Sequence, residues 1–262
     1  MKAISFELSG KTACFRKPDV NQFAYFSYNN IHKPVLLGLL GAILGLKGHT
    51  QLFNENRQIE EDNKKIKKKA DKKPLNSGFP EFYEKLKGLK IAITPLAPHG
   101  YFSKKIQVFN NSVGYASKEM GGNLIVREQW LEEPKWQIMI LDNSSNEYEQ
   151  LKEYLLEKKA VFIPYLGKND HPATIEKTQE IELGEFIENI KLTSVFIENR
   201  CEIFAGKTRG DLPYLFREVS PMRLQKEYHF YEYESLIFTN HKIVSSTHRD
   251  IYSYDNKNYF FL

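Results

Sequence analysis

The run that decides the fold is Pro34-Val35-Leu36-Leu37-Gly38-Leu39-Leu40-Gly41-Ala42-Ile43-Leu44-Gly45. A proline suits the first position of a helix, and the apolar residues after it predict a helix packed inside the protein. Each glycine inside a helix costs roughly 0.5–1 kcal/mol relative to alanine. Because the three glycines are three and four residues apart, they share one side of the helix. We expect that side to lie close against another segment of backbone.

The elements around this helix predict an α+β fold. Upstream, residues 3–8 alternate apolar and polar side chains and predict a strand. Downstream, we expect a short helix at 80–87, an amphipathic helix at 146–159, and strands at 89–96, 136–141 and 160–163. The main order is strand, helix, strand, strand, helix, strand. This order predicts a ferredoxin-like antiparallel sheet of four strands with two helices on one face.

The chain divides into two parts on this interpretation. Residues 1–170 form the ferredoxin-like domain, with a projecting insertion rich in Gly, Lys and aromatic residues at about 98–127. A Glu-rich link at 176–185 then leads into residues 171–262, where only strand-like runs are visible. We expect a smaller, mainly β part that packs against the first domain or a protein neighbour.

Composition places the chain among soluble globular proteins, since 41% of its 262 residues are hydrophobic and 27% are charged. The longest apolar run without charge, residues 35–46, is shorter than the roughly 18 residues of a membrane span. Glu7 interrupts the apolar stretch that a signal peptide would need. We therefore expect a cytoplasmic protein with no membrane partner. Cys14 and Cys201 are interpreted as buried or idle thiols.

Charge is distributed unevenly along the chain. Residues 1–130 hold 21 Lys and Arg against 11 Asp and Glu, whereas residues 131–262 hold 16 against 22. The front half is therefore the candidate for binding a polyanion. A Lys-rich stretch at 57–73 contributes part of this excess and is expected to be a solvated flexible loop.

Motifs for several classes of enzyme are absent from the sequence. It has no phosphate-binding P-loop, no Gly-x-Gly-x-x-Gly, no nucleophile elbow and no His-Glu-x-x-His, and its seven histidines show no i, i+4 ligand spacing. We expect no cofactor and no metal. What remains is basic residues interleaved with aromatic ones, the combination that binds phosphates and stacks on unpaired bases of single-stranded RNA. The alternative is that the rings belong to the core and the cations to solvent.

Four segments resemble the CRISPR-associated Cas-five family. They are residues 8–18 (Leu8 to Pro18), 28–45 (Tyr28 to Gly45), 127–134 (Arg127 to Pro134) and 164–173 (Pro164 to Ala173), in order over the first two thirds of the chain. The resemblance implies the RAMP ferredoxin-like fold and a subunit of the type I Cascade complex, with the length and the Pro-Tyr-Leu-Gly motif most similar to type I-B relatives. It implies partners too: the 5′ handle of CRISPR RNA, the backbone and large subunits, and target DNA only through the complex.

Carried onto this sequence, the resemblance makes the insertion at about 98–127 a thumb-like hairpin. The candidate RNA-binding residues are Arg16, Lys17, Tyr25, Tyr28, His32, Lys33, Lys104, Lys105, Lys118 and Arg127. His32 and Lys33 are included because a helix N-terminus favours phosphate. One branch of the family cleaves precursor RNA without metal, using a Tyr and an adjacent Lys-His pair. This chain has no Lys-His dipeptide, so the alternative of a metal-independent endoribonuclease rests on His99, His32 and Tyr25.

Overall fold

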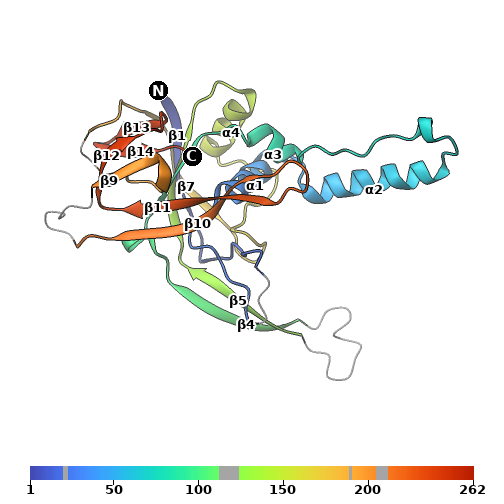
Figure 1. The fold of residues 1–262 in the computed structure, drawn as a ribbon, viewed down its shortest axis with the longest axis horizontal. Helices are drawn as coiled ribbons and strands as arrows, with labels where there is room; N and C mark the ends of the chain where they lie inside the picture. The colour runs from blue at the N-terminus through green and yellow to red at the C-terminus, as the bar shows by residue number, and fades with distance from the viewer. Residues whose placement is uncertain (20–22, 112–123, 189–190, 205–211) are drawn as a thin grey trace.

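The central sheet of the computed structural model has four antiparallel strands in the order β3-β6-β1-β7. These are β1 (Lys2–Ser9), β3 (Ile91–Pro95), β6 (Lys135–Leu141) and β7 (Thr174–Glu182). The helix α1 (Lys33–Leu44) follows β1, and α4 (Asn146–Leu156) follows β6, so the order along the chain is βαββαβ. This confirms the ferredoxin-like arrangement (Figure 1). The structure describes residues 1–262 apart from 20–22, 112–123, 189–190 and 205–211.

The fourth strand lies later in the chain than the sequence predicts. Residues 160–163 are not a strand, because their backbone turns to the end of α1: the N–H groups of Val161 and Phe162 donate to the carbonyls of Ile43 and Ala42 at 2.9 and 3.1 Å. The strand that pairs with β1 is β7, so the expected link at 176–185 was wrong over most of its length. As an edge strand with mostly exposed, charged side chains, β7 carries little of the apolar pattern that identifies a buried strand.

Both faces of the sheet are covered. Ile4, Phe6 and Leu8 of β1 point into the main core with Trp136 and the apolar side chains of α1 and α4. On the opposite face, Ala3, Met139 and Ile181 form a second cluster with Tyr259 and Phe261 from the C-terminal segment. The sheet is therefore sandwiched between the helices and the end of the chain, which explains why β1 is buried on both sides.

The ends of α1 follow from its sequence. Pro34 occupies the first turn, and Gly45 takes a left-handed conformation (φ 73°) whose N–H donates to the carbonyls near the end of the helix. A Cβ on Gly41 would lie 2.6 Å from the Cβ of Phe82 in α3 (Glu81–Leu86), so this glycine is closely approached, but by a side chain and not by the backbone that the sequence predicts. At Gly38 the nearest atom of Phe82 is 3.8 Å away, which is ordinary contact.

Beyond α1 the chain forms an arm, which corrects the expected flexible loop. The helix α2 (His49–Lys65) leaves the body after a sharp bend and buries none of its side chains. A short 3₁₀ turn (η1, Lys69–Asp71) precedes an extended return segment (Figure 1). Within the described part of the chain no single helix is long and apolar enough to cross a membrane; α1 and α2 pass that test only as a pair, bent by 77°.

The C-terminal part is mainly β, as expected, and it packs against the first part. Its strands are β8 (Phe196–Ile197), β9 (Cys201–Phe204), β10 (Leu215–Leu224), β11 (Tyr231–Thr239), β12 (Lys242–Ser246), β13 (Ile251–Tyr254) and β14 (Lys257–Phe260). The backbone N–H of Leu224 donates to the Tyr83 hydroxyl at 2.7 Å, and that of Val195 donates to the carbonyl of Ile93 at 2.9 Å. Both halves of the chain contribute to one continuous core.

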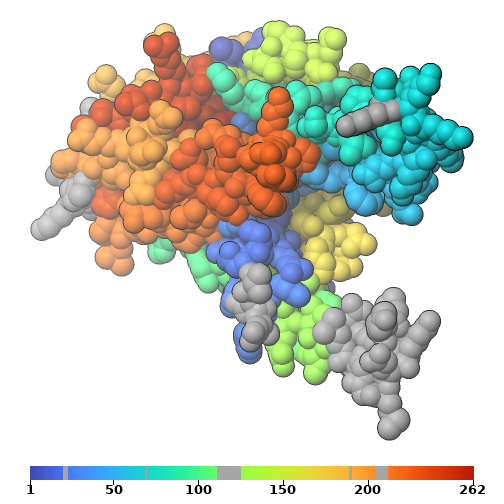
Figure 2. Space-filling model, turned by 45° about the vertical axis from the view of Figure 1, so that its right-hand side comes forward, coloured from blue at the N-terminus to red at the C-terminus, as the bar shows by residue number. Residues whose placement is uncertain are grey.

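A hairpin projects from the body at the place where the sequence predicts an insertion. It consists of β4 (Lys104–Asn111) and β5 (Leu124–Glu132), and the short strand β2 (Thr12–Ala13) pairs with β5 at its base. Figure 1 shows the hairpin and the arm leaving the body separately, and Figure 2 shows the same separation from a second direction. Lys118 lies outside the described residues.

Candidate nucleic-acid interface

The β4–β5 hairpin has two different faces. Register pairs Val108 with Arg127 and Gln107 with Glu128, and residues paired in this way point to the same side of the sheet. One side therefore carries Arg127 with the exposed apolar side chains of Ile106, Val108 and Ile125. The other side carries Lys105 and the Glu128–Trp130 pair. The two sides of the hairpin therefore differ, one exposing apolar side chains and the other carrying the hydrogen-bonded Glu128 and Trp130.

Residues 15–19 and 23–28 lie by the edge of β5 that faces away from β4, and they bring distant cations together. The N–H of Tyr25 donates to the carbonyl of Arg127 at 2.9 Å, and the N–H of Gln129 donates to the carbonyl of Tyr25 at 2.8 Å. Arg16 pairs with Ser27 across the same segment. Arg16 and Tyr25 consequently share the base of the hairpin with Arg127, which lies more than a hundred residues further along the chain.

Cations cover aromatic rings throughout this region. The guanidinium carbon of Arg16 lies 3.3 Å from the centroid of Tyr25, and that of Arg127 lies 5.6 Å from the centroid of Phe23. Lys104 is placed 5.0 Å from the Tyr101 ring. The predicted interleaving of charges and rings is therefore present in space. One face of Tyr25 is occupied by the Arg16 guanidinium, however, so that face of the ring is not free to stack on another flat group.

Lys17 and Lys104 lie near a buried carboxylate that sequence reasoning missed. The Glu218 side chain, from β10, accepts hydrogen bonds from the backbone N–H groups of Asn29 and Asn30 at 2.8 and 3.3 Å. Burial raises the pKa of Glu218, against the opposing effects of those N–H groups and of Lys104 and Lys17. Burial lowers the pKa of Lys104, against the charge of Glu218. A carboxylate from the C-terminal half thus binds the backbone of residues 29 and 30 and lies near enough to Lys104 and Lys17 for their charges to act on it.

Asn29 and Asn30 connect this segment to the hairpin and the sheet. Asn29 donates to the carbonyl of Gly100 at 2.7 Å and accepts from the N–H of Phe102 at 3.1 Å, just before β4 begins. The Oδ1 of Asn30 accepts from the indole N–H of Trp136 at 3.0 Å. Both amides are buried. Their hydrogen bonds hold residues 29 and 30 against the root of the hairpin and against β6.

Three predicted RNA contacts point inward, which corrects the candidate list. His32 is 2% exposed and lies edge-on to the rings of Phe15, Tyr28 and Tyr231, and burial lowers its pKa to about 3. Tyr28 is itself buried at 3% exposure, with a pKa raised by burial, so no base reaches its ring. These residues belong to the core because the entry to α1 is packed beneath β11.

Lys33 also turns away from solvent. Its Nζ donates to the backbone carbonyl of Leu262 at 2.9 Å, and burial lowers its pKa to about 8. The other predicted positions differ in accessibility. Arg16 is exposed, whereas Lys17, Tyr25, Lys104 and Arg127 are half-buried, and exposed Lys105 forms an ion pair with Glu132 at 3.7 Å.

The alternative catalytic set is not brought together as a site. His32 is inaccessible, and Tyr25 lies under Arg16. His99 is exposed, with its ring 4.6 Å from that of Tyr214. General acid–base catalysis needs a titrating group within hydrogen-bond reach of the reacting oxygen, and the burial of His32 removes one of the three candidates.

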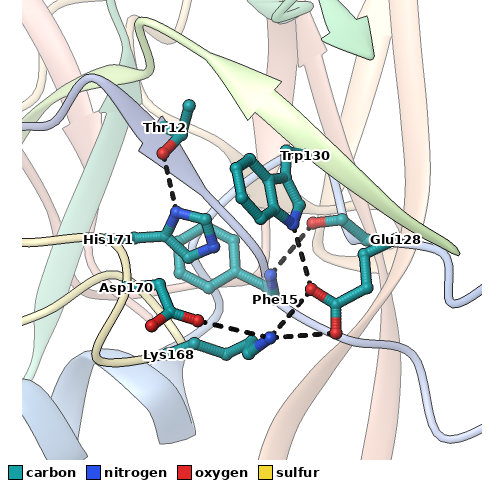
Figure 3. Close-up of polar contacts among 8 residues, drawn as sticks. Thr12, Phe15, Glu128, Trp130, Lys168, Asp170 and His171 are labelled. Carbon is teal, nitrogen blue, oxygen red and sulfur yellow. Dashed lines mark hydrogen bonds and ion pairs between the residues drawn. The ribbon is translucent and has the colours of Figure 1, made fainter. Parts of the chain in front are cut away.

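The inner side of the hairpin is tied to the body by a network of polar side chains (Figure 3). Lys168 Nζ donates to both carboxylate oxygens of Glu128 at 2.9 and 2.8 Å, and the Trp130 indole N–H donates to the same carboxylate at 3.0 Å. His171 lies edge-on to Trp130 at 4.6 Å and is 2.7 Å from the Thr12 hydroxyl. Two of the segments that carry the family resemblance, 127–134 and 164–173, meet in this network.

Gly167 lets the loop at 164–173 lie close against the backbone at Cys14, just before Arg16. It has φ 89°, and a Cβ there would lie 2.0 Å from the carbonyl oxygen of Cys14. Beside it, the N–H of Cys14 donates to the carbonyl of Leu166 at 3.2 Å. The backbone leading into Phe15 and Arg16 is thereby clamped against this loop.

This chain is similar to known proteins in its three-dimensional structure but not detectably in its sequence. No protein-family profile matches the sequence, and no curated protein matches it. A solved chain titled "CRISPR RNA-guided surveillance complex" is similar at 9% identity with a TM-score of 0.50, over 92% of this chain and 90% of that chain. "Crystal structure of a CRISPR protein from Archaeoglobus fulgidus" is similar at 9% identity and a TM-score of 0.47, over 99% and 98%. The protein therefore has an α+β, ferredoxin-like fold, similar over 92% of its length to that of a solved chain titled "CRISPR RNA-guided surveillance complex".

Proposed function

We propose that this chain is a subunit of a CRISPR effector complex and holds the 5′ handle of CRISPR RNA at the base of the β4–β5 hairpin. The observation that carries the proposal is the convergence of Arg16, Tyr25 and Arg127 at one edge of β5, near the base of the hairpin. The fold shared with a chain of a CRISPR RNA-guided surveillance complex supports it. Its other partners in that assembly would be the first backbone subunit and the large subunit.

The geometry suits a single strand better than a duplex at this place. Guanidinium groups bind phosphate and also offer a flat surface on which an unpaired base stacks. Arg16 already stacks on Tyr25, so its outer face is presented in a defined orientation. Lys17 follows Arg16 in the chain, and its charge acts on Lys104, so two further positive charges belong to the same region. A short RNA strand crossing this surface would meet stacking and phosphate contacts together.

The test is the affinity of the full chain for a fluorescein-labelled single-stranded RNA of about ten nucleotides with handle sequence, a length within the range of single-strand sites. Replacing Arg16 and Arg127 together with Gln should raise Kd about tenfold or more, since stacking on one base alone contributes roughly 1–3 kcal/mol. The matched control replaces the exposed Arg200 and Arg249 with Gln. Equal Kd values for the two double variants would overturn the proposal.

A further inference from the structure

The arm formed by α2 and its return segment is strongly polarised in charge. Residues 63–73, at its outer end, contain seven lysines and one aspartate. Along the helix below, acidic side chains are already paired: Glu55 with Lys47 at 2.8 Å and Glu61 with Arg57 at 3.3 Å. The positive charge of the arm is therefore concentrated at its tip.

Two reciprocal asparagine clamps hold the tip in shape. Asn63 donates to the carbonyl of Lys73 at 2.8 Å and accepts from its N–H at 2.9 Å. Asn56 does the same with Asn76 at 2.9 and 2.8 Å. The two asparagines are seven residues apart, about two helical turns, and so lie on one face of α2. The return segment is therefore bound to the helix by two asparagine side chains, each of which pairs with both backbone groups of one residue.

These clamps bring lysines from both segments to one place. Asn63 of the helix is bonded to Lys73 of the return segment. Lys64, next to Asn63, and Lys72, next to Lys73, therefore both lie beside this clamp. Lys64, Lys67, Lys68 and Lys72 are exposed and make no ion pair among the described residues, while Lys65 lies 3.5 Å from Asp62. A cationic surface that is preorganised loses less conformational entropy when an anion binds.

The tip also differs from the hairpin base in having no aromatic ring. The exposed ring on α2 is Phe53, twelve residues before Lys65 and so about 18 Å along the helix axis. A surface of lysines without rings contacts phosphates and has nothing on which to stack an unpaired base. That chemistry fits a duplex, whose bases are already stacked inside and whose backbone carries closely spaced negative charge.

We propose that the arm tip is a second nucleic-acid site, separate from the hairpin base, which binds the phosphate backbone of duplex DNA without reading its sequence. Figures 1 and 2 show the arm and the hairpin at different places on the body, so the two sites do not compete for one surface. The inference goes beyond the proposed RNA site and does not depend on it, since its residues are different.

The experiment measures binding of the full chain to a labelled duplex DNA of random sequence, by fluorescence anisotropy at several salt concentrations. The test variant replaces Lys64, Lys67, Lys68 and Lys72 with Gln. A matched control replaces four exposed lysines on the body with Gln: Lys2, Lys158, Lys226 and Lys242. Because α2 buries no side chain, the test variant should fold normally, and circular dichroism checks this.

The expected result is a loss of duplex affinity of at least tenfold at 100 mM salt and a salt slope flattened by about 3 to 4, since each neutralised phosphate contact contributes about 0.9 to the slope. The control variant should retain both, and single-stranded RNA affinity should be unchanged in the test variant. The proposal would be overturned if the test variant kept the duplex Kd and salt slope of the parent, which is also the result expected of a tip that binds an acidic protein. It would equally be overturned if the control variant lost as much duplex affinity as the test variant. Loss of RNA binding by the Arg16 and Arg127 variant with duplex binding intact would separate the two sites.

Discussion

Removing the Lys168 ammonium should loosen the hairpin from the body, and the size of the effect can be worked from the network. Lys168→Met deletes two hydrogen bonds to a carboxylate whose side chain is only 6% exposed. Removing one partner of a fully buried ion pair costs about 3–5 kcal/mol. The Lys168 side chain is still 31% exposed, so solvent screens part of the interaction. We therefore expect a loss of about 2 kcal/mol in the free energy of unfolding.

This loss predicts a fall in melting temperature of about 4–8 °C for a chain of this size, at about 2–4 °C per kcal/mol. Thermal unfolding followed by circular dichroism measures it. A double-mutant cycle with Glu128→Gln should give a coupling energy of about 1–2 kcal/mol between the two positions, because they share two hydrogen bonds.

The control is Lys87→Met, which removes an ion pair of similar length, 2.7 Å to Glu84, between exposed side chains. Such pairs contribute little, and the melting temperature should hardly change. The reasoning fails if Lys168→Met is no more destabilised than Lys87→Met, or if its effect and that of Glu128→Gln simply add. Either result would mean that the two motifs meet without stabilising each other.

Two further perturbations probe the backbone and the core around the site. Gly167→Ala should destabilise by several kcal/mol, because its Cβ would overlap the Cys14 carbonyl at φ 89°; a melting temperature within about 2 °C of the parent contradicts this. The free energy of unfolding should fall as pH drops below about 6.5 towards 3, because unfolded His32 binds a proton that the folded, buried ring with its pKa of about 3 does not. The decline should be shallower in His32→Gln, by up to about 1.4 kcal/mol per pH unit, in urea titrations. An identical pH slope in the variant would assign the decline to other groups.

The sequence alone was sufficient for elements whose signals are local. The helix from Lys33 to Leu44 follows from its apolar run with proline at the start, and β1 and β6 follow from dense apolar side chains. These features depend on neighbours along the chain, which periodicity records directly. The sequence did not predict the edge strand β7, because its side chains are mostly exposed and charged. It did not predict the helix α2 either, because an exposed helix in a Lys-rich stretch lacks an apolar stripe.

For the candidate site, sequence reasoning identified residue types but not which way they face. It found the cations at 16, 17, 104, 105 and 127, yet it could not tell that Tyr28 and His32 pack inside while Tyr25 remains half-buried beside Arg16. It also could not place Glu218 near Lys104, or pair Lys168 with Glu128, since the residues in each case are at least forty positions apart. The spacing of apolar residues along the chain determines local conformation. Tertiary packing decides which charged side chains converge, because it sets both the distances between residues remote in sequence and the solvent exposure of each side chain.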